Sequence, residues 1–172
     1  MRPALALIAL ILALPAVACG TSVGTRSPGG EPPRTADERV QRALDALDLS
    51  YEIDREADFK LGITMDGGRS QLLYIGSQTA HVGEMELRDV WSYVHQHRGA
   101  LTQDGAAWLL RRNDQVKLGS FGVITLGDGT SAVVFVVSVD ANGSVDDIRA
   151  ALLAVAETAD SAEQRLSSAD SF

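Results

Sequence analysis

The strongest pattern in the chain is a helical one near the carboxyl end. After Ser144, apolar residues recur at alternating spacings of three and four, which predicts one amphipathic helix over 145–167. An acidic residue three positions after Ser144 completes a capping box. A similar pair, Thr35 and Glu38, precedes a shorter run of apolar residues at helical spacing and predicts a first helix over 36–48.

Between these two helices, alternation of apolar and polar residues predicts strands. The cleanest alternation leads into Asp-Gly-Gly at 66–68, a hairpin turn signal because glycine tolerates positive φ. The last run is almost wholly apolar and β-branched, as in a central strand with both faces covered. The predicted strands are 51–53, 59–65, 72–75, 116–126 and 132–139.

The middle of the chain mixes the two periods. Residues 77–83 favour a loop. Over 84–97, four apolar residues that include Trp91 stand at helical spacing, and Gly99 follows, which predicts a second helix. Residues 106–111 fit either a strand or a short connection. The whole of 35–167 reads as one domain, with a frayed tail over 168–172.

The amino terminus has the pattern of an export signal. Arg2 is followed by an uncharged apolar run from Ala4 to Ala18, which is shorter than the roughly 20 residues that span a bilayer. A basic start, a short apolar run and small residues at its end are typical of a secretory signal peptide. We therefore expect residues 1–18 to be removed, so that Cys19 becomes the first residue.

The segment Ala-Val-Ala-Cys-Gly at 16–20 resembles a bacterial lipobox, although the position of Ala16 usually holds leucine. The resemblance implies lipidation of Cys19, with a diacylglyceryl group on its sulfur and palmitate-type acylation. Cys19 is the sole cysteine, so an internal disulfide is excluded. Ordinary cleavage that leaves Cys19 unmodified, or an uncleaved amino-terminal helix, are the alternatives.

The following segment, 20–34, is rich in glycine, serine, threonine and proline and predicts a flexible linker of roughly 20 Å average span. The linker would hold the domain just off a membrane of the bacterial cell envelope, facing the periplasm or the exterior. The formal charge of the chain is −8, and becomes −9 once Arg2 is removed. An acidic domain is repelled by phosphate backbones, so no nucleic-acid partner is expected.

The order of elements, the Leu-Asp-Leu-Ser-Tyr segment at 47–51, the Gly-Ser-Phe-Gly strand at 119–122 and the long last helix together resemble the YbjN-like and type III secretion chaperone superfamily. The resemblance implies an α+β fold with an antiparallel sheet of five or six strands and three helices, in the order α-β-β-β-α-β-β-α. It also implies a non-enzymatic binding role, often in a dimer. Secretion chaperones of this type are cytosolic, so their effector-binding role does not transfer to an exported chain.

The residues offer little for catalysis, metal or a cofactor. On the predicted second helix, His95 and His97 would point about 200° apart and could not share a metal ion. Ser120 lies in a predicted strand, whereas a nucleophile elbow requires a strand-to-helix turn. The turn at 127–129 is not followed by the lysine of a phosphate-binding loop. We therefore expect no enzyme activity, no bound metal and no cofactor.

Four residues are candidates for partner binding. Three helices cannot easily cover both faces of such a sheet, so either the exposed sheet face with Val134 or the predicted second helix with Trp91 is expected to contact a protein partner or a second copy of the chain. The alternative is that the second helix closes this face and leaves a monomer. Arg111 and Arg112 form a small basic group that could meet an acidic partner segment. The first hypothesis is a lipid-anchored binding domain; a carrier of a small apolar ligand and an envelope enzyme with an unrecognised site are the alternatives.

Overall fold

The structure is a computed structural model that describes residues 35–167 and 172. The predicted signal peptide, Cys19 and the linker lie outside the described residues, as do residues 168–171 of the tail. The elements, in order, are α1 (Glu38–Ala46), β1 (Glu52–Ile53), β2 (Phe59–Thr64), the 3-10 turn η1 (Asp66–Gly68), β3 (Ser70–Val82), β4 (Met85–His97), α2 (Gln103–Gln115), β5 (Ser120–Thr125), β6 (Ser131–Asp140) and α3 (Val145–Leu166).

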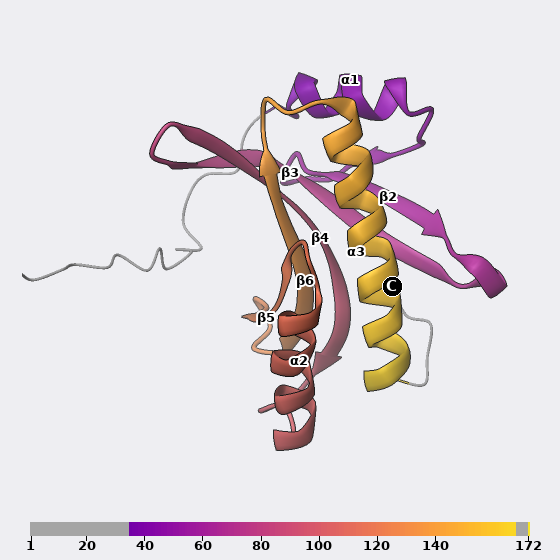
Figure 1. Ribbon diagram of the computed structural model, residues 1–172, viewed down its shortest axis with the longest axis vertical. Coiled ribbons are helices and arrows are strands. Elements are labelled where there is room, and N and C mark those ends of the chain that lie inside the picture. Colours follow the sequence, from indigo (N-terminus) through magenta and orange to yellow (C-terminus); the bar gives the residue numbers. More distant parts are fainter. Residues whose placement is uncertain (1–34, 168–171) are drawn as a thin grey trace, which may run out of the picture. The chain divides into compact units, whose positions relative to one another are not determined.

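The six strands form one antiparallel sheet in the order β1-β2-β3-β4-β6-β5. Figure 1 shows α3 crossing one face of this sheet, with α1 at one end and α2 beside β5. The predicted α+β class with three helices and a six-stranded antiparallel sheet is therefore confirmed. Among the described helices, none is long and apolar enough to cross a membrane.

The three helices bury their apolar sides in one core. The cluster contains Leu44 of α1, Leu109 of α2 and Val155 of α3, packed with strand side chains such as Leu73 and Phe135. These strand residues share one face because side chains alternate along a strand. We call this the core face of the sheet, and the opposite one the outer face.

The predicted first helix and the predicted last helix are both close to the structure. The helix predicted over 145–167 is α3, and Ser144 with Asp147 forms the expected capping box. The helix predicted over 36–48 is α1, but its N-cap is Asp37, which accepts the backbone N–H of Arg39, and not Thr35. The shift is two residues, which is within the usual uncertainty of helix ends.

The prediction was wrong in the middle of the chain. All but the first residue of the helix predicted over 84–97 forms the strand β4, and the second helix is α2, so one more strand precedes the second helix than predicted. The predicted loop 77–83 is the end of β3, which pairs with β4 in a hairpin that extends beyond the rest of the sheet (Figure 1). Residues 106–111, predicted as a strand or connection, are helical, with the hydroxyl of Thr102 capping the first turn.

The error has a physical cause. The residues at 84–97 are rich in valine, tyrosine and tryptophan, which favour strands. Because β4 lies between β3 and β6 and carries apolar residues on both faces, its alternation is masked and the apolar positions also satisfy a helical spacing. Pairing on both sides, which the local sequence does not reveal, decides the outcome.

The free edge of β5 is partly closed by a side chain from α2. The Asn113 amide accepts a hydrogen bond from the Phe121 backbone N–H at 2.7 Å and donates one to the Phe121 carbonyl at 3.2 Å. These are the two groups that another strand would use. Trp108 also packs on Phe121, with ring centroids 6.2 Å apart, so α2 is held to this edge on the core face.

Gly119, just before β5, tests how tightly this edge is packed. Its φ is +85°, and a Cβ would lie 2.5 Å from the Val136 carbonyl oxygen. Gly119→Ala should therefore lower the free energy of unfolding by about 2–4 kcal/mol, through backbone strain and a steric clash together. Gly129→Ala is the matched control, because its φ is +80° with no atom within 4 Å of a Cβ. The Gly129→Ala control should lower the free energy of unfolding by only about 1 kcal/mol. If urea titrations gave the same loss for both variants, the steric clash at position 119 would contribute nothing to stability.

Candidate functional site

The outer face of the sheet carries a row of aromatic and aliphatic side chains. In the strand register, Tyr74 of β3 stands opposite Trp91 of β4, and Trp91 stands opposite Val136 of β6. One step along, Tyr93 stands opposite Val134. None of these five residues belongs to the core cluster that the helices share. They form the centre of the outer face, and we call them the aromatic patch.

The rings of the patch are ordered by contact with one another. Tyr74 and Trp91 stack with centroids 5.4 Å apart and an angle of 13° between their planes. Tyr74 and Tyr93 meet edge to face at 5.6 Å. Both geometries are favourable for aromatic pairs. Val134 is only 3% exposed, whereas the three rings and Val136 are half-buried.

Partial burial raises the pKa of both tyrosines above the ordinary phenol value. The hydroxyls of Tyr74 and Tyr93 are therefore neutral over the physiological range. The patch offers flat apolar ring surface together with neutral phenol groups, a composition that is common at protein interfaces.

Phe172, which follows α3 in the sequence, also contacts this patch. The Phe172 ring is 6.1 Å from the Tyr93 ring, centroid to centroid, and the two planes are tilted by 35°. Phe172 is half-buried. An aromatic side chain from another part of the chain is thus seated at one end of the patch.

The structure brings together two of the four predicted partner-binding residues. Trp91 and Val134 lie on the outer face of adjacent strands, although Trp91 was predicted on a helix. Arg111 and Arg112 lie instead on α2, which packs on the core face, and Arg112 bonds Gln115 at 3.3 Å. The basic group therefore does not adjoin Trp91 and Val134.

Sequence reasoning missed Tyr74, Tyr93 and Phe172. The signal was present for the first two: Tyr93 lies next to buried Val94 once 84–97 is taken as a strand, and Tyr74 lies between buried Leu73 and Ile75. No local pattern indicates that Phe172 reaches the sheet.

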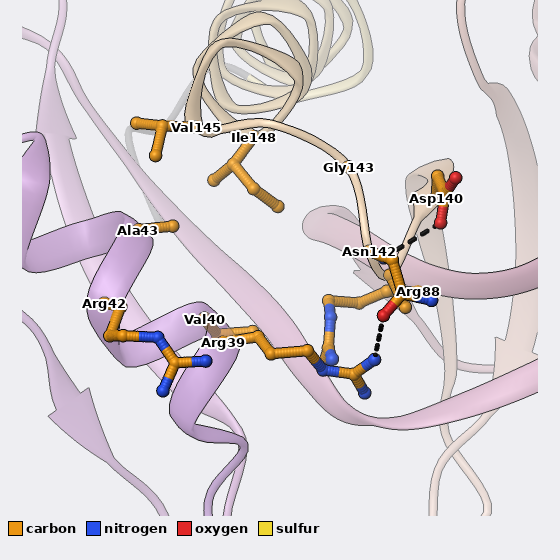
Figure 2. A pocket seen from close by; sticks show the side chains of 11 residues that line it. Arg39, Val40, Arg42, Ala43, Arg88, Asp140, Asn142, Gly143, Val145 and Ile148 are labelled. Carbon is orange, nitrogen blue, oxygen red and sulfur yellow. Dashed lines mark hydrogen bonds between the residues drawn. The ribbon is translucent and has the colours of Figure 1, made fainter.

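A separate pocket of about 310 Å³ lies between α1, the end of β6 and the start of α3 (Figure 2). Three arginines line it. Arg88, only 1% exposed, donates to the Asp37 carboxylate and to the Gly76 carbonyl. Arg39 donates to Asp37 at 2.7 Å and to Glu86 at 2.9 Å. Figure 2 shows the third, Arg42, on α1 beside Arg39.

The charges of this pocket are already paired inside the protein. Burial by itself would raise the pKa of Asp37, but hydrogen bonds from Arg39 and Arg88 hold it well below its usual range. A hydrogen bond from Arg39, with others from Thr79 and Asn142, lowers the pKa of Glu86 to about 2. The Asp147 carboxylate caps the nearby start of α3. These pairs fix α1 against the β3–β4 hairpin, so the pocket serves the fold.

The histidines also differ from expectation. His95 and His97 lie on β4, so they share one face of a strand and their rings stack at 5.9 Å, instead of pointing apart as predicted for a helix. Both ring nitrogens of His97 are buried with no hydrogen-bond partner in the described part of the chain. Within that part, no three potential metal ligands come together. The prediction that the chain binds no metal stays a prediction.

The pairing of Asp37 predicts a pH dependence. A carboxyl whose folded pKa is depressed adds stability above its ordinary pKa near 4, and this stability is lost as the pH falls toward the folded value. The melting temperature should therefore drop between about pH 4 and pH 2. Asp37→Asn should flatten that drop and destabilise the domain by about 2–4 kcal/mol at pH 7, because Arg88 loses its partner.

Glu157→Gln, on an exposed position of α3, is the control and should leave the pH profile of the melting temperature unchanged. If Asp37→Asn and Glu157→Gln gave the same profile as the unaltered protein, the Asp37–Arg88 pair would not be a source of acid sensitivity.

Comparison with known proteins finds one matching family and a solved structure with a similar fold. Residues 36–167 match the YbjN family, whose description is "putative bacterial sensory transduction regulator". Among curated proteins, none matches the chain. One solved structure that matches is YbjN of E. coli, described as "a putative transcription regulator"; it is 14% identical, the match covers 74% of this chain and 91% of that one, and the TM-score is 0.50.

At 14% identity the structural match speaks for the fold alone. The family match spans almost the whole described domain, from the residue before the α1 N-cap to the end of α3. The fold expected from the sequence and the family found by comparison therefore coincide, and the chain belongs to the YbjN family.

Proposed function

We propose that this protein is a lipid-anchored, non-catalytic binding module of the bacterial cell envelope, and that the aromatic patch binds a polypeptide partner bearing aromatic or aliphatic side chains. The observation that carries the proposal is the sidedness of the fold. The described helices all pack on the core face, while Tyr74, Trp91 and Tyr93 present ring surface on the other.

The chemistry of the occupant follows from the patch. Tryptophan and tyrosine contribute strongly to protein–protein binding because they bury large areas at low entropic cost. The contact of the Phe172 ring with the Tyr93 ring, at 6.1 Å between centroids, supports an aromatic side chain as the occupant of this part of the patch. The family description, a regulator of sensory transduction, is consistent with a role in binding another protein.

A carrier of a small apolar ligand is less well supported. The space between the sheet and the helices is filled by buried side chains such as Leu73, Phe135 and Val155. The apolar pocket beside Leu49 and Leu152 measures about 160 Å³, below the roughly 300–1,000 Å³ of typical ligand sites.

Anchoring rests on the lipobox-like segment and on the single cysteine. Cys19→Ser should move the protein from the membrane fraction to the soluble envelope fraction and abolish labelling by an alkyne analogue of palmitate. The reason is that stable anchoring requires more than one acyl chain, and the first chains would be attached to the Cys19 sulfur. A Cys19→Ser protein that still sedimented with membranes after a high-salt wash would refute lipid anchoring through this residue.

Partner binding is tested by a photo-crosslinking residue at position 136, on the outer face, in living cells. Position 110, where Leu110 is exposed on α2, is the control. A polypeptide crosslinked from 136 but not from 110 would then be purified and its affinity measured. Trp91→Ser should weaken binding by at least about tenfold, and Leu110→Ser should leave it unchanged.

The result decides between occupants. Crosslinks from position 136 to a second copy of the chain, with dimers in light scattering, would replace the partner by a homodimer. An equal set of crosslinks from both positions would leave the outer face without a binding role.

A further inference from the structure

We infer that the polypeptide bound by the aromatic patch is positively charged: an arginine or lysine of the partner lies beside the turn that joins β1 to β2, while a neighbouring aromatic or aliphatic side chain covers the rings. This inference rests on the proposed partner binding and adds the chemical class of the partner. It starts from residues 54–58, whose backbone closes with hydrogen bonds between Asp54 and Asp58 and between Ala57 and Asp54. We call them the acidic turn.

The charge of the acidic turn reaches the rings of the patch. Burial is the main cause of the raised pKa of Tyr93, and the negative charges of Asp54 and Glu56 raise it further. Asp54 also raises the pKa of Tyr74, after burial and the neighbouring Tyr93. Because solvent and salt screen charges over short distances, these carboxylates lie close to the phenols. The electrostatic field at this margin of the patch is therefore negative, and it attracts a cation.

The backbone of the turn fixes the Asp54 carboxylate. Its Oδ1 accepts the N–H of Glu56 at 3.0 Å and the N–H of Asp58 at 2.9 Å. Within residues 35–167, no donor reaches its Oδ2 and no cation forms an ion pair with it. A carboxylate that is held in one orientation and keeps one oxygen unbonded is a ready acceptor for a guanidinium or ammonium group.

The nearby cations leave an excess of negative charge. Residues 52–60 contain four acidic and two basic side chains, so two carboxylates remain when each cation has one partner. The ion pairs are Arg55–Glu56 at 2.6 Å and Lys60–Glu52 at 3.8 Å. The Arg55 side chain is 90% exposed, and an ion pair in water contributes little. Burial raises the pKa of Asp58, and the charges of Asp54 and Glu56 raise it further, so the excess acts within the turn as well.

Rings and a carboxylate side by side favour one kind of segment. A guanidinium can lie flat on an aromatic ring while it bonds a carboxylate, because it is planar and weakly hydrated. An acidic segment would be repelled by Asp54, and so would the anionic headgroups of a membrane. A purely apolar segment would leave the carboxylate unused. A basic residue next to an aromatic or aliphatic one therefore fits this part of the outer face best.

The test uses the full chain carrying Cys19→Ser and three peptides of equal length that differ only in charge. Each has blocked ends and one central phenylalanine, flanked on both sides by arginine, by glutamine or by glutamate. Binding is followed by the indole N–H signals of the two tryptophans in NMR spectra. Trp91 lies in the patch, whereas Trp108 packs on Phe121 on the core face and is the internal control.

The arginine peptide should bind at least about fivefold more tightly than the glutamate peptide, with the glutamine peptide between them. It should shift the Trp91 signal and leave the Trp108 signal in place. In the double variant Asp54→Asn with Glu56→Gln, the preference for arginine should fall below about twofold. Asparagine at position 54 retains the Oδ1 acceptor for both backbone N–H groups, so the turn is preserved.

Glu38→Gln with Glu157→Gln is the matched control. It also removes two exposed carboxylates, and Glu38 is paired with Arg42 as Glu56 is paired with Arg55. Both control positions are on helices that pack on the core face, α1 and α3. The control should therefore keep the preference for the arginine peptide, although its net charge changes by the same amount.

Three equal peptide affinities, each with a shift of Trp91, would overturn the inference and leave the proposed function standing. An equal fall of the preference in both double variants would also overturn it, because net charge alone would then explain the binding. Failure of the proposed function looks different: no peptide would shift Trp91, no partner would crosslink from position 136, and the inference would fall with it.

A partner crosslinked from position 136 provides a second measurement. Its affinity should fall by at least about threefold in Asp54→Asn with Glu56→Gln and stay unchanged in the control variant. Equal affinities for the two double variants would show that the acidic turn takes no part in binding that partner, which would overturn the inference.

Discussion

The structure depends on one constraint: its described helices all serve the same face of the sheet. A six-stranded sheet exposes two broad faces, and burying apolar area is the main favourable contribution to folding. The core face is covered by α1, α2 and α3. The outer face must reduce its contact with water by other means, and it does so with rings that lie against one another across β3 and β4. The fold and the proposed binding surface therefore both follow from the placement of the described helices on one face of the sheet.

The buried Arg88 is central to the attachment of α1 to the sheet. A cation inside the core face is tolerated only with a charged partner and further hydrogen bonds. Asp37 supplies the charge from the start of α1, and the Gly76 carbonyl supplies an acceptor from β3. Arg39 extends the network to Glu86 on the hairpin. The first helix is thereby fixed to two strands by charges as well as by apolar contacts.

The sequence allowed the fold class, both terminal helices and the central strand β6 to be predicted, because each has a period or a cap that is local in sequence. It did not allow β4 to be recognised, because a strand paired on both sides and apolar on both faces has no clear alternation. Counting helices predicted an outer face left without a helix; Trp91 lies on that face, but on a strand and not on a helix, and Val134 lies there buried. Their role in binding stays a prediction. Tyr74 became the centre of the candidate site only through register, and Phe172 joined it only through the path of the chain in three dimensions.

The amide of Asn113 has a consequence for how this protein associates. By pairing with both backbone groups of Phe121, it takes the place of one residue of a seventh strand. The opposite edge is β1, which is only two residues long. Asn113 interrupts the border along β5, and β1 covers the first two residues of β2, so each border leaves only a short stretch of unpaired backbone for a neighbouring strand. Neighbouring copies of this domain therefore have little backbone with which to pair edge to edge into fibres, and contacts between them are left to the faces of the sheet and helices.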